Sequence, residues 1–288
     1  MTAFDLQCHS RCSDGVLEPA AVMERAKQDG MELVALTDHD TMDGVAEARA
    51  RAQELGLRFS PASEISAVEG RHQDLHVCGY ELDVEDPGLV RALDDYRADR
   101  QARVEGIADR LEELGFTVDR TVLAERKAAG LPIGRPHIAD AVLQHPDNRK
   151  RLEREGTTTK NTFFPEYIVP GAKAFVQRTR PTVFDAIDVI HAAGGVAVWA
   201  HPFWDLDDPQ EVVDTIEAFA ARGLDGVEVF YATHDAEQTR LLHETCTRLG
   251  LLMTGSSDFH GPEHERFDHF GNFETYGLEP ELGPIGSA

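Results

Sequence analysis

The stretch FDLQCHSRCSDG, residues 4–15, introduces the pattern that organises the whole chain. Phe4 and Leu6 indicate a short apolar strand, and side chains of the metal-binding type follow it at once. These are the imidazole of His9 and the carboxylate of Asp14, whereas position 7 carries a glutamine, whose neutral amide is a poorer donor for transition metals. The stretch therefore predicts a strand that ends in ligand-type side chains, and by itself it leaves open whether they form a metal site with a weak ligand at Gln7 or no metal site.

Short apolar strands alternate with amphipathic helices along most of the chain. Apolar runs predict strands at residues 3–6, 32–36, 57–60, 75–80, 195–200, 224–230 and 250–254. Apolar residues at i, i+3, i+4 spacing predict helices over 18–29, 43–55, 182–193, 209–222 and 235–249. Strands that alternate with helices imply a parallel sheet, and ligand-type residues at their ends indicate an α/β fold, a distorted (β/α)7 barrel with one unit missing.

The alternation breaks between about residues 90 and 175. A long charged helix is predicted over 88–114 and another near 120–129, and GLPIGRPHIADAVL, residues 130–143, reads as a loop that leads into a short helix. We expect three segments: a first part of the barrel at 1–88, a mostly helical insertion at 89–175 that caps the site, and a second part of the barrel at 176–288.

Composition excludes several classes of function. The net charge of −24 argues against non-specific coating of DNA or RNA, although residues 91–173 are close to neutral. No run of 18 apolar residues predicts a membrane span, and the N-terminus lacks the pattern of a secretory signal. The four cysteines form no CxxC pair, which favours reduced thiols and a cytoplasmic location.

Ligand-type side chains gather where the predicted strands end. Carboxylates crowded into one concave site would repel each other without a cation, and a mixture of histidine, aspartate and glutamate suits Mn²⁺, Zn²⁺ or Fe²⁺. The set is too large for one ion, and Glu64 is a plausible bridge between two. The candidate ligands are Gln7, His9, Asp14, His39, Glu64, His76, His201, Asp258 and His260.

Six motifs together resemble those of the PHP superfamily, named for polymerase and histidinol phosphatase. They are DLQCHS, TDHD, SEIS, DLHVCGY, AHP and GSSDFHG, and the resemblance covers about residues 1–80 and 176–261. The middle block, with GRPHIADAV and PGAKAFV, resembles a narrower subgroup. That subgroup comprises phosphatases that act on nucleoside 3′,5′-bisphosphates, some of which are also 5′→3′ exoribonucleases on short RNA.

The resemblance implies two or three divalent ions, most simply Mn²⁺. One ion would take His9, Glu64 and Asp258, with position 7 as a further ligand. A second would take Glu64, His76 and His201, and a third would take Asp14, His39 and His260. The family usually has histidine where this chain has Gln7, so the first corner departs from the pattern.

The resemblance also implies a phosphate-binding site in the insertion. Arginine can donate two hydrogen bonds to a phosphate and lysine adds a point charge, so Arg135 and Lys173, with help from His137, are expected to hold the 5′-phosphate. His201 and His234 are candidates for the acid that protonates the leaving ribose oxygen.

The expected activity is removal of the 3′-phosphate from a nucleoside 3′,5′-bisphosphate, with short RNA as a second substrate. The alternatives are a histidinol-phosphate phosphatase, an amidohydrolase that uses the same metals, and a non-catalytic metal-binding module. Asp5 and Asp38 are possible second-shell acceptors for ligand histidines, and His191 reads as structural.

Overall fold

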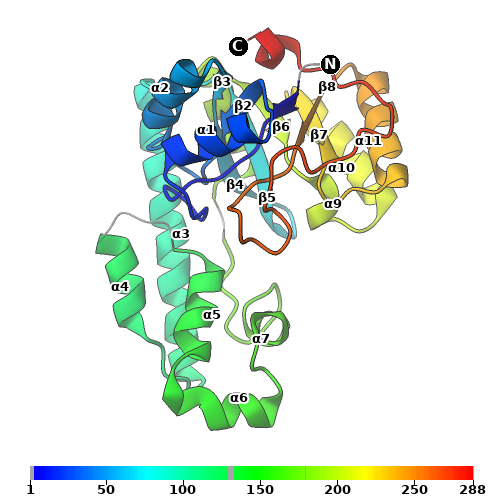
Figure 1. Ribbon diagram of the computed structural model, residues 1–288. Helices are drawn as coiled ribbons and strands as arrows, with labels where there is room; N and C mark the ends of the chain where they lie inside the picture. Colours follow the sequence, from blue (N-terminus) through cyan, green and yellow to red (C-terminus); the bar gives the residue numbers. More distant parts are fainter. Residues whose placement is uncertain (1–2, 129–132, 179, 288) are drawn as a thin grey trace. The chain divides into compact units, whose positions relative to one another are not determined.

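The computed structural model describes residues 3–128, 133–178 and 180–287, and the chain forms two compact units (Figure 1). Residues 1–94 together with 181–288 make the first unit, and residues 95–180 make the second. The borders therefore lie at 94/95 and 180/181, where the sequence predicted 88/89 and 175/176. Each unit has its own hydrophobic core.

The first unit contains the strands and the helices that cover them. Its strands are β1 (Phe4–Asp5), β2 (Leu33–Leu36), β3 (Arg58–Pro61), β4 (Ser63–Glu69), β5 (His72–Tyr80), β6 (Val196–Trp199), β7 (Gly226–Tyr231) and β8 (Leu252–Ser256). Its helices are α1 (Pro19–Gln28), α2 (Val45–Leu55), α8 (Val183–Ala192), α9 (Pro202–Asp205), α10 (Pro209–Ala220) and α11 (Ala236–Leu249). A last 3₁₀ turn covers Gly283–Ser287.

The strands form two sheets, and one of them is mixed. In the first sheet β1, β2 and β3 run parallel, and in the second β6, β7 and β8 run parallel. Strand β5, however, pairs antiparallel with both β4 and β6. The prediction of an all-parallel sheet is wrong at this place, because residues 63–80 form a hairpin. Its turn at Gly70 has a φ of 54°, a conformation that glycine adopts without strain.

The ends of the two sheets are joined by short parallel bridges. One bridge pairs Cys8, after β1, with Phe259, after β8, and another pairs His39, after β2, with Glu64 of β4. The amide of Leu6 also donates to the carbonyl of Gly255 on β8. These contacts bring the segments after β1, β2 and β8 together at β4, which is where the candidate ligands lie.

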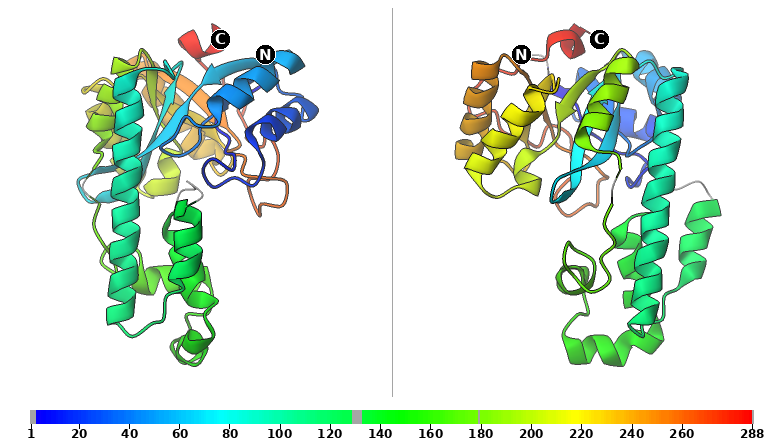
Figure 2. Two further views of the ribbon diagram at one scale, coloured as in Figure 1. Left: turned by 90° about the vertical axis from the view of Figure 1, so that its left-hand side faces the viewer. Right: turned by 180° about the vertical axis from the view of Figure 1, so that it is seen from behind.

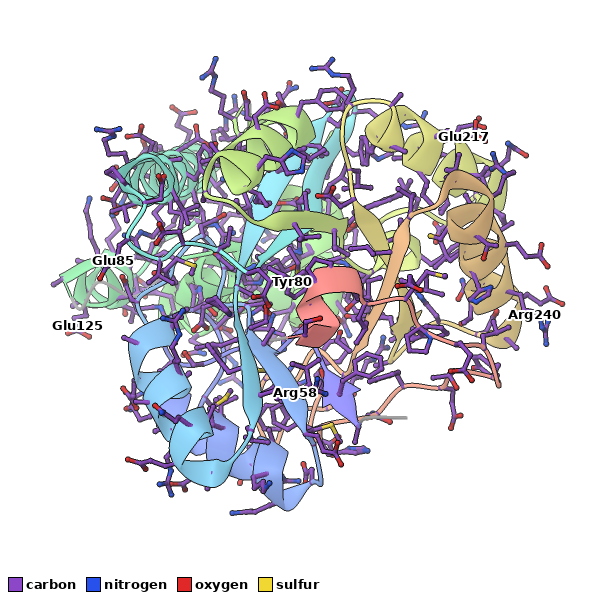
Figure 3. The ribbon with its side chains drawn as sticks, turned by 90° about the horizontal axis from the view of Figure 1, so that it is seen from above. Arg58, Tyr80, Glu85, Glu125, Glu217 and Arg240 are labelled. Carbon is purple, nitrogen blue, oxygen red and sulfur yellow. The ribbon has the colours of Figure 1, made fainter. Side chains whose placement is uncertain are left out.

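Helices α10 and α11 of the first unit begin with side-chain caps. Asp208 begins α10 by accepting hydrogen bonds from the amides of Gln210 and Glu211, and Asp235 begins α11 in a capping box with Gln238. Helices α10 and α11 lie side by side in all the ribbon views (Figures 1 and 2). Figure 3 shows Arg240 of α11 pointing outwards, whereas Tyr80 lies among the strands.

The second unit is helical, as its sequence predicts. Helix α3 (Pro87–Glu113) begins in the first unit, and α4 (Arg120–Ala128), α5 (Arg135–Leu143), α6 (Arg149–Glu155) and α7 (Lys160–Tyr167) follow, with a 3₁₀ turn at Pro146–Asn148. Its core is built mainly from aliphatic residues and from Phe116, Phe163 and Tyr167, whose rings pack together. Within the described part of the chain, no helix has the length and apolarity to cross a membrane.

Candidate metal centre

The segments after β1 and β8 place three candidate ligands side by side. The amide of His9 donates to the carbonyl of Phe259 at 2.8 Å, so the two segments run in register. As a result the His9 Nε2 atom lies 3.0 Å from Asp258 Oδ1. His260 stacks on the His9 ring with 4.4 Å between ring centroids. The sequence prediction that these three residues meet is consistent with this arrangement.

Glu64 and His76 reach the same place from the β4–β5 hairpin. The register pairs Glu64 with Cys78, so His76 is the diagonal neighbour of Glu64 on the same face. His201, which follows β6, lies beside His76 because the amide of Ala200 donates to the His76 carbonyl. The expectation that every ligand follows the end of a parallel strand is therefore wrong for Glu64 and His76, which lie within antiparallel strands.

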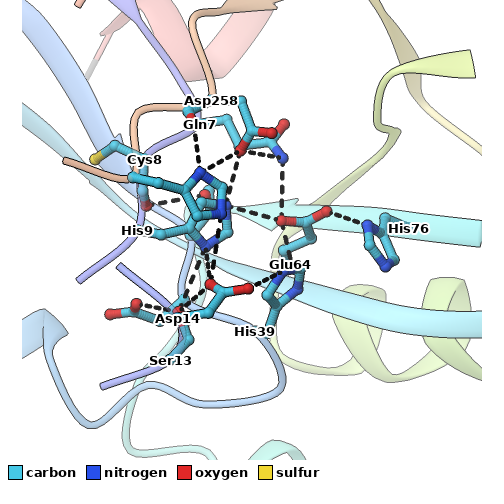
Figure 4. Close-up of polar contacts among 12 residues, drawn as sticks. Gln7, Cys8, His9, Ser13, Asp14, His39, Glu64, His76 and Asp258 are labelled. Atoms are coloured by element: carbon cyan, nitrogen blue, oxygen red, sulfur yellow. Dashed lines mark hydrogen bonds and ion pairs between the residues drawn. The ribbon is translucent and has the colours of Figure 1, made fainter. Parts of the chain in front are cut away.

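The carboxylate of Glu64 is the centre of the site (Figure 4). Its Oε2 atom lies 3.0 Å from Gln7 Nε2 and 3.1 Å from His9 Nε2. Its Oε1 atom lies 2.6 Å from His76 Nδ1 and 3.2 Å from His201 Nε2. The two oxygens thus face two different sets of donors, which is the geometry of a bridging carboxylate.

Asp14 lies near both His39 and His260, the other two candidate ligands of the third set. Its Oδ2 atom lies 3.5 Å from His39 Nε2, and its Oδ1 atom lies 3.5 Å from His260 Nε2. The side chain of Asp14 is 40% exposed, whereas those of His9 and Glu64 are fully buried. The site is therefore open to solvent on the side of Asp14, where a substrate could enter.

The donor set fits divalent cations. Three groups of side chains have ligand atoms within 4.8 Å of one another: His9, Asp14, His39 and His260; His39, Glu64 and His76; and His9, Glu64 and Asp258. The donors are imidazole nitrogens and carboxylate oxygens, which suit Mn²⁺, Zn²⁺ or Fe²⁺. Among the residues that the structure describes, the buried atoms Gln7 Oε1 and His39 Nδ1 have no hydrogen-bond partner. A cation would satisfy the His39 nitrogen as it stands.

Gln7 lies beside Glu64 and Asp258, in the ligand set for which its sequence position made it a candidate. Its side chain is fully buried, and its amide nitrogen donates to Glu64 Oε2 and, at 3.4 Å, to Asp258 Oδ1. Its amide oxygen has no hydrogen-bond partner among the described residues. To ligate a cation held between Glu64 and Asp258, the amide would have to turn over, since only its oxygen is an acceptor.

The electrostatics of the site favour positive charge beside the carboxylates. Burial lowers the pKa of His201, but its hydrogen bond to Glu64 and the nearby carboxylate of Asp205 outweigh burial and raise that pKa to about 10. Burial would raise the pKa of Glu64, yet the surrounding imidazoles hold that pKa well below its usual range. For His39 burial dominates and lowers the pKa to about 4, so its imidazole is neutral, as a metal ligand must be.

Buried carboxylates that are not in the ligand set hold the ligand-bearing segments. Asp5 accepts hydrogen bonds from the amides of Ser257 and Gly271, so it fixes the backbone beside Asp258 rather than a histidine. Asp38 accepts from the amide of Ser10 at 2.7 Å and from the hydroxyl of Ser13 at 2.5 Å.

The hydroxyl of Ser13 in turn lies 3.4 Å from His9 Nδ1. Asp38 therefore reaches a ligand histidine through Ser13, which is consistent with its predicted role, whereas the hydrogen bonds of Asp5 go to backbone amides and not to a ligand histidine.

Sequence reasoning missed Glu228 and Tyr231 on β7. Glu228 accepts from the amide of His201 at 2.8 Å and from the hydroxyl of Ser256, and burial raises its pKa to about 8. The Tyr231 hydroxyl donates to Asp258 Oδ2 at 2.8 Å. A signal was present in the run GVEVFY, where one acidic residue interrupts an apolar strand.

The backbones of His201 and Asp258 are strained. Their φ angles are 33° and 55°, in the left-handed region that non-glycine residues rarely adopt. Strain of this kind persists only where the surroundings hold it, and here Glu228 holds the His201 amide while Tyr231 holds the Asp258 side chain. The strain supports a functional role for both residues.

His234 lies near the centre but makes a different contact. It is 5% exposed, its Nδ1 atom is 3.1 Å from the carbonyl of Val229, and its Nε2 atom has no hydrogen-bond partner among the described residues. Burial lowers its pKa to about 4. A neutral ring that donates from Nδ1 presents Nε2 as an acceptor, so His234 fits the role of an acceptor better than that of a proton donor.

The three predicted phosphate-binding residues belong to the second unit. Arg135 is the first residue of α5, and His137 Nδ1 accepts a hydrogen bond from the amide of Gly134 at 3.0 Å. Lys173 is exposed, pairs with Glu166 and lies over the ring of Tyr167. His191, predicted to be structural, pairs with Asp225 at 2.8 Å and takes no part in the candidate ligand groups.

Comparison with known proteins gives consistent results over most of the chain. A model of the PHP domain matches residues 5–129. The chain is 33% identical over 260 residues to a 5′-3′ exoribonuclease of Haemophilus influenzae, covering 90% of each protein. It is 32% identical over 273 residues to a 3′,5′-nucleoside bisphosphate phosphatase of Chromobacterium violaceum, covering 91% of this chain and 88% of that relative.

A solved structure shares the fold. It is described as an amidohydrolase from Chromobacterium violaceum with bound sulfate and no metal. Its TM-score is 0.80 at 30% sequence identity, and the match covers 99% of this chain and 96% of that one.

Proposed function

This chain belongs to the PHP domain family, and on that basis we propose that it is a metal-dependent phosphoesterase that converts nucleoside 3′,5′-bisphosphates, such as adenosine 3′,5′-bisphosphate, to the 5′-monophosphates. The observation that carries the proposal is the cluster of eight side chains with nitrogen or oxygen ligand atoms that gathers around Glu64. The bisphosphate phosphatase relative supports the substrate class, and the exoribonuclease relative supports short RNA as a second substrate.

Two or three divalent cations fit the cluster, with Mn²⁺ the simplest choice and Zn²⁺ or Fe²⁺ the alternatives. The first set is His9, Glu64 and Asp258 with Gln7 beside it, the second is Glu64, His76 and His201, and the third is Asp14, His39 and His260. When bound, such cations polarise the phosphoryl oxygens and offset the charge that develops in the reaction. We also propose that the bridges after β1, β2 and β8 close the strands into a distorted barrel around this cluster.

The surrounding residues have defined tasks in this proposal. Tyr231 and Glu228 keep Asp258 and His201 in their strained conformations. The Nε2 atom of His234, which has no partner in the described part of the chain, accepts a hydrogen bond from the substrate, with a ribose hydroxyl as the simplest donor. His201 is the other candidate for the proton that the leaving oxygen needs, but this role is open to it only while its imidazole is not a metal ligand.

The 5′-phosphate is proposed to bind Arg135, His137 and Lys173. Bidentate hydrogen bonds from arginine and the charge of lysine are the interactions that phosphate prefers.

The four cysteines are free thiols in the structure, which supports the proposal of a cytoplasmic location.

We expect adenosine 3′,5′-bisphosphate to be cleaved with a much higher kcat/KM than 3′-AMP. The reason is that only the bisphosphate carries the 5′-phosphate that the second unit is proposed to bind. A panel with Mn²⁺ that includes histidinol phosphate and N-acyl amino acids separates the alternatives in the same assay. Equal kcat/KM for the two nucleotides would show that the protein does not recognise the 5′-phosphate. Turnover of only the N-acyl amino acids would identify an amidohydrolase.

Arg135→Ala is expected to lower kcat/KM for the bisphosphate by roughly 10- to 100-fold, because a hydrogen bond to a charged group contributes about 1.5–3 kcal/mol. Metal content should stay the same. Arg149→Ala is a matched control, since Arg149 is an exposed arginine of the same unit that pairs with Glu153. Unchanged kinetics in Arg135→Ala, or an equal loss in Arg149→Ala, would contradict the assignment.

A further inference from the structure

We propose that Trp204 is a stacking platform for the nucleobase of the substrate. Trp204 lies on the short helix α9, three residues after the candidate ligand His201, and its side chain is 51% exposed. The other tryptophan, Trp199, is fully buried in β6. A large aromatic side chain that is half exposed near the candidate ligands offers a face on which a flat apolar group can stack. The inference rests on the proposed function, because it assumes a nucleotide substrate.

A chain of ring contacts connects Trp204 to the cluster. The Trp204 ring lies 5.8 Å from the ring of Phe267, and the Phe267 ring lies 5.7 Å from that of His260. Phe267 is buried, and its carbonyl accepts a hydrogen bond from the His260 amide at 2.9 Å. Trp204 is therefore two ring contacts from a candidate ligand, a separation on the scale of one nucleoside. A 3′-phosphate at the cluster would leave its base near this ring.

A cationic side chain also lies beside Trp204. The guanidinium group of Arg266 lies 6.0 Å from the centroid of the Trp204 ring, in a cation–π position, and Arg266 is exposed. Stacking accepts any base, because every base has a π-face, so the proposal predicts weak discrimination between adenine and the other bases.

The first test separates the base from the phosphates. kcat/KM is measured for adenosine 3′,5′-bisphosphate and for 2-deoxyribose 3,5-bisphosphate, which has no base. The preference is the ratio of kcat/KM for the nucleotide to kcat/KM for the abasic compound. In Trp204→Ala this ratio should fall roughly 10- to 100-fold, the scale of base–aromatic stacking. Trp204→Phe should keep most of it, whereas Trp204→Leu, which is apolar without a π-face, should lose it. Val90→Ala removes another exposed apolar side chain of the same unit and should change nothing.

The second test follows Trp204 directly and needs no turnover. AMP should protect the exposed tryptophan from quenching by acrylamide, and ribose 5-phosphate at the same concentration should not. Trp204→Phe leaves only the buried Trp199, so this variant should show neither the quenching nor the protection. A Trp204 that acrylamide cannot reach in the ligand-free protein, or equal effects of AMP and ribose 5-phosphate, would overturn the platform.

The two proposals fail in different ways. If the native protein does not cleave the bisphosphate, the proposed function is wrong, and AMP protection of Trp204 still decides whether a base binds there. If the native protein cleaves it and Trp204→Ala keeps the full preference over the abasic compound, only the platform is wrong.

Discussion

Glu64→Gln is expected to reduce turnover of adenosine 3′,5′-bisphosphate by at least about 1,000-fold and to release bound metal. Glutamine keeps the shape of the side chain but removes the charge that cations need. Lewis-acid stabilisation of a developing charge contributes several kcal/mol, and each 1.36 kcal/mol corresponds to a factor of ten in rate. Metal content measured beside the rate should therefore fall together with activity.

The reason for so large an effect is that the two oxygens of Glu64 serve different partners. Oε2 faces Gln7 and His9, and Oε1 faces His76 and His201. A substitution at this position should weaken two cation sites at once, whereas a substitution at His76 should weaken one. Titration of Mn²⁺ into Glu64→Gln and His76→Ala compares the two, and equal losses of stoichiometry would show that Glu64 does not bridge.

Glu69→Gln provides the matched control for this experiment. Glu69 ends the same strand and lies outside the candidate ligand groups. Native rate and metal content are expected there. A folded Glu64→Gln that keeps its metal and turns over within a few fold of the native rate would refute the central role of Glu64.

The strand ends could be predicted from the sequence because their signals are local. An apolar run followed by TDHD or SDFH fixes both the strand and the side chains at its end, and His39 and Asp258 follow β2 and β8 as predicted. The β4–β5 hairpin could not be predicted in the same way. Strand β4 is buried but carries polar residues such as Ser63, which donates to the carbonyl of Asp38, and the first half of β5 is only half-buried at residues such as His72. A pattern of apolar runs therefore detects only the second half of the hairpin.

Residues that act through the backbone were also beyond sequence reasoning. Glu228 holds His201 by accepting its amide proton, a contact that depends on how β6 and β7 are paired rather than on spacing in the chain. The same holds for Asp5, which is more than 200 positions from the Ser257 amide that it accepts. Long-range pairing decides such contacts, and a single sequence does not specify it.

Removal of divalent cations is expected to abolish turnover completely, and the ion beside Gln7 should be the first to leave. The neutral amide of Gln7 turns its nitrogen, not its oxygen, towards Glu64 and Asp258. A cation at this corner must therefore either turn the buried amide over or do without it, and both weaken its binding. Stepwise dialysis against a chelator should give a partly loaded protein before an inactive one, and Mn²⁺ should restore activity.

Gln7→His isolates the contribution of that corner. An imidazole at position 7 would add a nitrogen donor to the set of His9, Glu64 and Asp258 and should tighten the first ion by roughly 10- to 100-fold, the scale on which changes beside a metal act. Activity need not rise, since a more tightly held ion also holds the phosphate product more strongly. Metal analysis of both proteins after identical dialysis decides the matter. If the native protein keeps every ion as firmly as the Gln7→His variant does, the amide is either a competent ligand or irrelevant to binding. In that case the cation site of His9, Glu64 and Asp258 is not the weakest of the set.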